Sequence, residues 1–346
     1  MISTQPGLGR LAGKALRDQG AKVLEDGNDG RADVVIFEHR RPDDLDLSIA
    51  EDLFAVVGRT TGKGSAHKIA ARLFDERRWQ EGFDAAKRQG SRVGAATGFR
   101  VIARVLSEQG FKRTDLRGEV AEVVGRWRPR WRVKDPADVE VWVLEVRRQT
   151  FVAAIRISSP EMRSRGGRAV ELEGSLRPVV AAALVKSALR PTGLLFDPFC
   201  GSGTILGEAR GVGWSVRGLD IEPAAVEAAR ANFPGIEVMV GDAADLPLAD
   251  EEAAAIVTNA PFGVQHVPRT GGRALGEWWR LVLAEFRRVV RTGGTVIILH
   301  PEDPTFARAL KAESGLQLRH KIPIRTLGRS AVIWSLARSS PPETGP

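Results

Sequence analysis

The sequence predicts an α/β fold with a parallel sheet in its C-terminal half, preceded by a smaller α+β region. Two observations predict the parallel sheet: short apolar runs alternate with helical segments after residue 190, and the first run leads into a turn with two glycines. A third observation sets the N-terminal region apart. Its segments follow the order strand, helix, strand, strand after an α+β lead-in, and most of the net positive charge lies among them.

The first apolar run and its turn occupy residues 194–204, LLFDPFCGSGT. Residues 194–196 predict a strand, Asp197 and Pro198 end it, and a helix begins after Gly201-Ser202-Gly203. Glycines let the backbone approach a ligand closely because no Cβ stands in the way. The spacing is not G-x-G-x-x-G, and no Lys-Ser/Thr pair forms a phosphate-binding loop. A tight turn without a ligand is therefore also possible, and the following strands decide.

Each later strand of this half ends in a polar side chain. The strand 214–219 ends in Asp220, the strand 236–240 leads into Asp242, and the run 253–257 leads into Asn259. Open α/β sheets bind ligands at the carboxyl ends of their strands, where these groups would gather. Asp220 can accept both hydroxyls of a ribose, and Asp242 can accept an adenine amino hydrogen. The sequence therefore predicts a nucleotide-like ligand at this edge.

These motifs, with residues 259–263 (NAPFG), resemble the class I S-adenosylmethionine-dependent methyltransferases that act on exocyclic amino groups of nucleobases. The resemblance implies a Rossmann-like, seven-stranded methyltransferase domain. It implies S-adenosylmethionine as cofactor, with these binding residues: Asp197, Phe199, Gly201, Gly203, Thr204, Asp220, Ile221, Asp242, Ala243 and Asn259. The implied catalytic residues are Asn259, Ala260, Pro261 and Phe262, although that family's Asp/Asn-Pro-Pro-Tyr/Phe motif has proline where this chain has Ala260.

The segment before the first strand extends the resemblance. Residues 175–178 (SLRP) and the apolar helix 179–189 are similar to the lead-in of the RNA guanine-N2 methyltransferases that contain a THUMP domain. Residues 165–168 lack the aromatic residue of that family's Arg-Gly-Tyr-Arg-like segment, so no role is assigned to Gly167. The order of elements before residue 160 resembles a ferredoxin-like domain followed by a THUMP domain. We therefore expect a ferredoxin-like domain at 1–62, a THUMP-like domain at 63–160, the methyltransferase domain at 161–338 and a disordered tail at 339–346.

The remaining elements follow from periodicity and from capping signals. In the N-terminal half we expect a helix at 8–19, strands at 23–24 and 34–37, an apolar helix or helix–strand piece at 49–57, helices within 63–92, a strand at 99–105, a helix at 116–124 and a hairpin of 139–146 with 151–157. In the C-terminal half we expect helices at 224–231, 275–290 and 304–312, a strand at 295–299 and a hairpin of 320–325 with 331–336.

Charge is distributed unevenly along the chain. Residues 59–134 carry 19 Lys and Arg against 8 Asp and Glu, a net charge of +11, whereas residues 161–346 carry +2. A basic segment of this kind indicates a nucleic-acid partner. Trp127 and Trp131 either stack on bases or pack into the domain. The candidate RNA contacts are the cations around these indoles: Arg126, Arg128, Arg130, Arg132 and Lys134.

Composition excludes several other classes of protein. No apolar run reaches the ~18 residues of a membrane span, and no signal-peptide pattern opens the chain. Cys200 is the only cysteine, so we expect neither an internal disulfide nor a cysteine-cluster metal site, and amine methylation needs no nucleophilic thiol. The five histidines are scattered without ligand spacing, so we expect no metal. We expect a cytoplasmic protein and favour a monomer.

The sequence thus predicts an RNA guanine-N2 methyltransferase that acts on tRNA. Guanine-N2 methylation of 23S ribosomal RNA and adenine-N6 methylation of a nucleobase stay open, because Asn-x-Pro-Phe motifs serve both amines. A different class also stays open, a non-catalytic RNA-binding protein that keeps the methyltransferase fold. The nucleotide position and the number of methyl groups transferred do not follow from the sequence.

Overall fold

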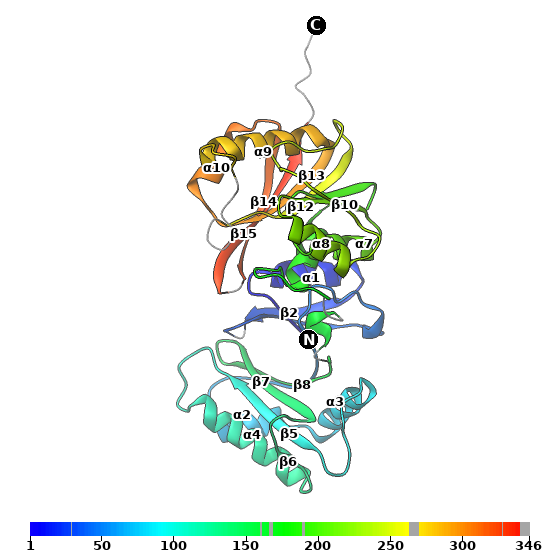
Figure 1. The fold of residues 1–346 in the computed structure, drawn as a ribbon. Coiled ribbons are helices and arrows are strands. Elements are labelled where there is room, and N and C mark those ends of the chain that lie inside the picture. The colour runs from blue at the N-terminus through cyan, green and yellow to red at the C-terminus, as the bar shows by residue number, and fades with distance from the viewer. Residues whose placement is uncertain are drawn as a thin grey trace. The chain divides into compact units, whose positions relative to one another are not determined.

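The computed structural model describes residues 1–28, 30–159, 161–165, 169–188, 191–262, 270–326 and 328–339. The chain forms two compact units, Met1–Arg163 and Ser164–Pro346 (Figure 1). Gly167, Gly263, residue 189 of the predicted helix and all but the first residue of the predicted tail lie outside the described residues. The division of residues 1–160 into two domains stays a prediction.

The first unit contains one eight-stranded mixed sheet with the strand order β2-β3-β1-β4-β8-β7-β5-β6. Strand β4 pairs antiparallel with β8, so the two domains expected within residues 1–160 share this sheet. Its elements are β1 (Ile2–Thr4), α1 (Gly9–Asp18), β2 (Lys22–Asn28), β3 (Asp33–Glu38), η1 (Pro42–Asp44), β4 (Asp52–Thr61), α2 (Ala66–Leu73), α3 (Glu76–Arg88), β5 (Gly98–Arg104), α4 (Arg113–Trp127), β6 (Arg132–Val133), β7 (Val139–Arg147) and β8 (Thr150–Arg156), followed by the short helix α5 (Glu161–Ser164).

Helices α2, α3 and α4 pack against this sheet through one shared core. Two of them begin at residues whose side chains cap the helix, as is usual for Ser and Asp. The Ser65 hydroxyl accepts from the Lys68 amide at 3.3 Å, and the Asp75 carboxylate accepts from the Arg78 amide at 2.9 Å. The apolar faces of α2 and α3 are buried in this core, so the basic residues of both helices stay on the surface.

The expectation of a helix or helix–strand piece at 49–57 is wrong. The strand β4 covers Asp52–Thr61, with buried Phe54 on one face, and no helix forms there. Periodicity cannot separate a short apolar run in a helix from one in a strand. Here the neighbouring chain decides, because β4 pairs with β1 on one side and with β8 on the other.

The second unit contains a seven-stranded sheet with the order β11-β10-β9-β12-β13-β15-β14. Strand β15 runs in the direction opposite to the other six strands, which are parallel to one another. The carboxyl ends of the other six strands therefore lie at one edge. The elements of this unit are α6 (Pro178–Ser187), β9 (Leu194–Asp197), α7 (Thr204–Gly211), β10 (Ser215–Asp220), α8 (Pro223–Asn232), β11 (Glu237–Val240), β12 (Ala253–Asn259), α9 (Leu275–Val289), β13 (Val290–His300), α10 (Pro304–Ala312), β14 (Leu316–Thr326) and β15 (Arg329–Arg338).

A core cluster of this unit lies between the sheet and helices α9 and α10. Helix α9 buries one face, where Trp278, Trp279 and Phe286 meet the apolar side chains of β12, β13 and β15. Strands β9 and β12 are neighbours although they are distant in sequence. The chain continues from β9 to β10 on one side of β9, and β12 lies on its other side, so the strand order reverses there. Ligands of open α/β sheets bind at such a switch point.

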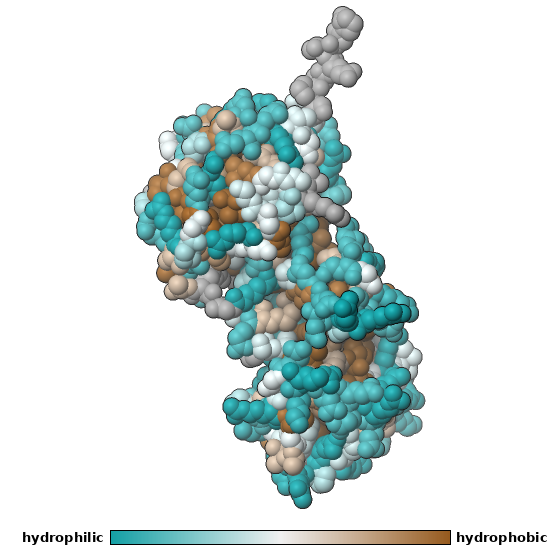
Figure 2. All heavy atoms as spheres, turned by 90° about the vertical axis from the view of Figure 1, so that its right-hand side faces the viewer, coloured by the Kyte–Doolittle hydropathy of each residue, from teal (hydrophilic) through white to brown (hydrophobic). Residues whose placement is uncertain are grey.

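Figure 2 shows that hydrophilic residues cover most of the face turned to the viewer. Val133 and Val240, the most exposed large apolar side chains among the described residues, belong to different units. No described helix has the length and apolarity needed to cross a bilayer.

Candidate active site

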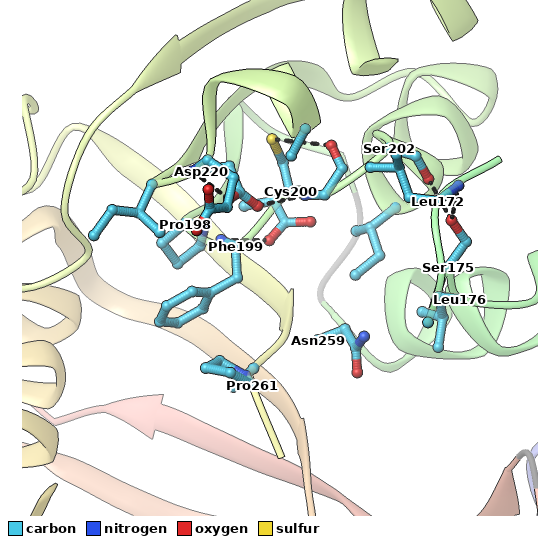
Figure 3. Close-up of a pocket in the computed structure, with 18 of the residues that line it drawn as sticks. Leu172, Ser175, Leu176, Pro198, Phe199, Cys200, Ser202, Asp220, Asn259 and Pro261 are labelled. Carbon is cyan, nitrogen blue, oxygen red and sulfur yellow. Dashed lines mark hydrogen bonds between the residues drawn. The ribbon is translucent and has the colours of Figure 1, made fainter. Parts of the chain in front are cut away.

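A cavity of about 580 Å³ lies in the second unit at the carboxyl edge of the sheet (Figure 3). The turn after β9 and the ends of β10, β11 and β12 line it. All four predicted catalytic residues line it, and so do nine of the ten predicted cofactor residues: Asp197, Phe199, Gly201, Thr204, Asp220, Ile221, Asp242, Ala243 and Asn259. The expectation that the strand ends bring these residues together holds in the structure.

The two glycines of the turn differ in what they do. Both have positive φ, 51° at Gly201 and 82° at Gly203, which disfavours residues with a Cβ. A Cβ on Gly201 would meet open space, whereas one on Gly203 would lie 3.0 Å from the Phe233 ring and 3.2 Å from the Ala229 Cβ. Gly203 does not line the cavity. It lets the turn and α7 pack against α8, and Gly201 gives a ligand access to the backbone.

Asp220 is held rigidly beside this turn. One carboxylate oxygen accepts from the Gly201 amide at 2.8 Å, and the other accepts from the Glu222 amide at 3.0 Å. At the end of β11, one carboxylate oxygen of Asp242 accepts from the Ala244 amide at 2.9 Å. Both carboxylates line the cavity with their orientation fixed by backbone amides. They are therefore preorganised acceptors for hydroxyl or amino groups of a bound ligand.

Asp197 is the most buried carboxyl group of the cavity, with 1% of its surface exposed. Its Oδ1 accepts from the Thr258 hydroxyl at 2.6 Å and from the Phe199 amide at 3.1 Å, but its buried Oδ2 has no hydrogen-bond partner among the described residues. Burial raises the pKa of Asp197 to about 7, and the nearby Asp220 charge acts in the same direction. A buried polar atom without a partner is costly, so this oxygen suits a ligand that brings a cation or a donor.

Cys200 follows in the same turn and is buried. Burial, together with the charges of Asp197 and Asp220, raises the pKa of its thiol well above the ordinary value. Only a thiolate is an effective nucleophile, so the structure gives Cys200 a packing role in the turn. The described residues contain no group of three or more His, Cys, Asp and Glu that could hold a metal ion.

The predicted catalytic tetrad begins at the last residue of β12. The Asn259 side chain lines the cavity and is hydrogen-bonded to none of the described residues. In Figure 3 the labelled side chains surround one space, with Asp220 and Ser202 above and Asn259 and Pro261 below. An amide that faces the cavity and has no partner among the residues described is available for a ligand.

The rest of the tetrad is tied to β13. The amide of buried Ala260 donates to the Leu299 carbonyl at 3.2 Å, and the Phe262 ring meets the edge of the His300 ring at 6.0 Å. His300 Nδ1 lies 2.8 Å from the Pro301 carbonyl, and burial lowers the pKa of this histidine. His300 is thus a packed side chain whose ring supports Phe262 of the tetrad.

Several residues of the cavity wall escaped the sequence interpretation. The segment 172–176 lines the cavity, and the Ser175 hydroxyl lies 3.1 Å from the Ser202 hydroxyl (Figure 3). Trp278 also lines it, and its buried indole N–H has no hydrogen-bond partner in the described part of the chain. Thr326 reaches the cavity from the end of β14. Only the SLRP lead-in at 175–178 was a signal in the sequence, and it carried no spacing from which a distance to the glycine turn follows.

The candidate RNA-binding cluster of the first unit is divided by the structure. Trp131 is buried, with its ring 4.8 Å from that of Phe83, and Trp127 packs 5.5 Å from Phe74, so Trp131 belongs to the core and the partly buried Trp127 packs against it. Arg128 stacks over Trp127 at 4.1 Å and donates to the Gln80 side chain, which makes it part of that packing. Four of the predicted cations are exposed and keep their availability for phosphates: Arg126, Arg130, Arg132 and Lys134.

The sheet order, the carboxylates at the strand ends and the Asn-Ala-Pro-Phe tetrad define an S-adenosylmethionine-dependent methyltransferase of class I. The family described as "RMKL-like, methyltransferase domain" matches residues 165–325. A crystal structure of TrmN from Thermus thermophilus superposes with a TM-score of 0.76 over 97% of this chain and 98% of that one, at 24% identity. The predicted methyltransferase fold is therefore confirmed.

The sequence comparison narrows the family. The chain is 31% identical over 235 residues to the "tRNA (guanine(6)-N2)-methyltransferase" of Thermus thermophilus, which covers 65% of this chain and 68% of that protein. It is 37% identical over 134 residues to the "tRNA (guanine(10)-N2)-dimethyltransferase" of Methanothermobacter thermautotrophicus, covering 37% of this chain and only 39% of the length of that relative. The chain belongs to this family of guanine-N2 methyltransferases, and the predicted family is confirmed. The THUMP-like domain within residues 63–160 stays a prediction.

Proposed function

We propose that this protein transfers a methyl group from S-adenosylmethionine to the exocyclic N2 amine of a guanine in tRNA. The observation that carries the proposal is the shared cavity: the Asn259 amide faces the same space as the carboxylates that suit the cofactor. Both similar proteins named above carry the words tRNA and guanine-N2 in their names. Cytoplasmic location and a monomeric state stay predictions.

The residues of the cavity fit this cofactor. Asp220 would accept the ribose hydroxyls, and Asp242 would accept an adenine amino hydrogen. The unpartnered Oδ2 of Asp197 suits a positively charged group, and the cofactor carries both an amine and a sulfonium. When bound, the cofactor supplies a methyl group activated by the positive sulfur.

Asn259 and Ala260 would orient the guanine amine. The lone pair of this amine is delocalised into the purine ring, which makes it a poor nucleophile. The side-chain oxygen of Asn259 and the backbone carbonyl of Ala260 would accept its two hydrogens, leaving the lone pair directed at the methyl group. Asn259 cannot act as a base, so the proton would leave after the transfer. Phe262 would stack on the base with ~1–3 kcal/mol, once the guanine has left its own stack.

The exposed cations of the basic segment would hold the RNA. Residues 59–134 carry +11, and Arg126, Arg130, Arg132 and Lys134 are exposed in the first unit. Phosphate contacts of this kind are independent of sequence. The first unit would thus supply affinity, and the second unit would supply cofactor and chemistry.

Methyl transfer from labelled cofactor into bulk tRNA and into ribosomal RNA, followed by nucleoside analysis, tests this proposal. We expect N2-methylguanosine in tRNA. Methyladenosine, or a product in ribosomal RNA alone, would instead support one of the alternative methylation reactions. RNA and cofactor binding without any methyl transfer would favour the non-catalytic RNA-binding protein.

The variant Asn259→Ala tests the tetrad. We expect kcat to fall by about a hundredfold or more, with the dissociation constants of cofactor and RNA changed less than about twofold, because the contact orients the amine in the transition state. Gln317→Ala, which removes an exposed amide on β14, is the matched control and should keep full activity. An Asn259→Ala enzyme with near-normal kcat would contradict the assignment.

A further inference from the structure

The hairpin of β14 and β15 reaches the mouth of the cavity. Strand β14 runs parallel to β13 and ends at the carboxyl edge, where its last residue, Thr326, lines the cavity. The sheet order places β9, β10 and β11 on one side of β12 and the hairpin on the other. Thr326 therefore approaches from the side opposite the carboxylates that suit the cofactor, which is where the acceptor base must enter.

This hairpin is unusually basic for the second unit. Residues 316–330 contain four Lys and Arg and no Asp or Glu, although residues 161–346 as a whole carry only +2. Arg329, the first residue of β15, pairs directly with Thr326. Residues paired in this way carry their side chains on the same face of the sheet, ≈ 4.5–5.5 Å apart at Cβ. Arg325 precedes Thr326 on β14 and is also exposed, but successive side chains of a strand point to opposite faces, so Arg325 lies on the other face from Arg329.

The cations of the hairpin differ in their present contacts. Lys321 forms an ion pair with Glu302 at 2.6 Å and lies 4.2 Å over the Trp334 ring, so its charge is already used. The Arg329 side chain is exposed and forms no ion pair or hydrogen bond with a described residue. Its position next to a residue of the cavity wall, without a partner there, marks it as a group for an external anion.

We propose that Arg329 binds an RNA phosphate next to the guanine that enters the cavity. This inference rests on the proposed function. It adds a phosphate contact in the second unit to the phosphate contacts proposed for the first unit. A base that leaves its stack carries its flanking phosphates to the mouth of the cavity. An arginine there can bind a phosphate with two parallel hydrogen bonds. The contact holds the nucleotide after flipping, so it acts close to the chemistry.

The hairpin also provides a matched control. Arg319 is an exposed cation on β14, seven residues before Thr326. At about 3.3 Å per residue it lies roughly 23 Å from the cavity wall. This separation exceeds the ~8 Å over which exposed charges act at physiological ionic strength. Arg319→Gln therefore removes the same charge from the same hairpin without affecting a phosphate at the mouth.

The test compares Arg329→Gln, Arg329→Lys and Arg319→Gln in the full chain, with tRNA transcripts as substrate. We expect the KM for RNA of Arg329→Gln to rise about tenfold, from the loss of one charge-assisted hydrogen-bond pair. The slope of log binding constant against log salt should fall by about one unit. The dissociation constant of S-adenosylmethionine should not change. Arg329→Lys should recover part of the loss, since a point charge still attracts phosphate.

Equal KM values for Arg329→Gln and Arg319→Gln would overturn the inference and leave the proposed function intact. A rise in KM for both variants would also overturn it, because the effect would then be that of general charge. If the wild type transfers no methyl group to RNA, the proposed function fails. The salt dependence of RNA binding by the wild type, Arg329→Gln and Arg319→Gln still decides whether the hairpin contacts RNA.

Discussion

The variant Asp197→Asn tests how the raised pKa of this buried carboxyl group affects the stability of the protein. Asp197 is 1% exposed, and burial raises its pKa from an ordinary 3.8 to about 7. Asparagine has nearly the same shape and keeps an oxygen that can accept from the Thr258 hydroxyl and the Phe199 amide. The substitution therefore removes the ionisable group with little change in packing.

The magnitude follows from the shift of about three pKa units. Below pH 3.8 the carboxyl is protonated in both states and has no pH-dependent cost. As the pH rises to about 7, the unfolded chain ionises while the folded protein keeps the proton, so the free energy of unfolding falls. The full cost is about 4 kcal/mol, at about 1.4 kcal/mol per unit. Of this, about 2.5 kcal/mol develops between pH 5 and pH 8.

Urea unfolding at pH 5, 6.5 and 8 measures this effect. Tryptophan fluorescence follows both units, because Trp278, Trp279 and Trp334 lie in the core of the second unit, and Trp79 and Trp131 lie in that of the first. We expect the stability of Asp197→Asn relative to wild type to increase by about 2.5 kcal/mol from pH 5 to pH 8. Asp245→Asn, which changes an exposed carboxyl group of the same unit, should differ from wild type by the same amount at every pH. A constant difference for Asp197→Asn would refute the reasoning.

Two further predictions concern binding. Asp220→Ala should weaken S-adenosylmethionine binding by ~1–3 kcal/mol, because it removes the fixed acceptor and frees the Gly201 amide, and calorimetry that finds no binding by the wild type would reject the cofactor site. Replacing Arg126, Arg130 and Arg132 together by Gln should weaken RNA binding and reduce the salt slope by up to about one unit per lost contact, with cofactor affinity unchanged. An unchanged salt slope would mean that these cations are only solvated.

Much of the cofactor side of the cavity could be predicted from the sequence because local rules fix it. A glycine turn after an apolar run marks the first βα unit, and each later parallel strand must end at the same edge. Asp220 and Asp242 were therefore predictable from their positions at strand ends. The prediction of no catalytic thiol agrees with a buried Cys200 whose pKa is raised.

The rest depends on contacts between distant parts of the chain. Thr326 reaches the cavity because β15 lies between β13 and β14, so that β14 runs parallel to β13 and ends at the carboxyl edge. Sequence spacing does not reveal that order. In the sequence Trp278 is one of the apolar residues of an amphipathic helix. Its place in the cavity wall, and the lack of a partner for its indole N–H among the described residues, follow only from the structure. Trp127 and Trp131 lie within a run of cations, yet Trp131 is buried in the aromatic core of the first unit and Trp127 packs against that core.

The cavity contains two buried polar groups of opposite character. Asp197 Oδ2 is a buried acceptor and Trp278 Nε1 is a buried donor, and neither has a hydrogen-bond partner among the described residues. An unpaired buried polar group costs stability, since such groups are normally paired. A ligand that brings both a positive charge and hydrogen-bond acceptors would remove both costs at once, and S-adenosylmethionine has both. We therefore expect the cofactor to stabilise the second unit more in the wild type than in Asp197→Asn.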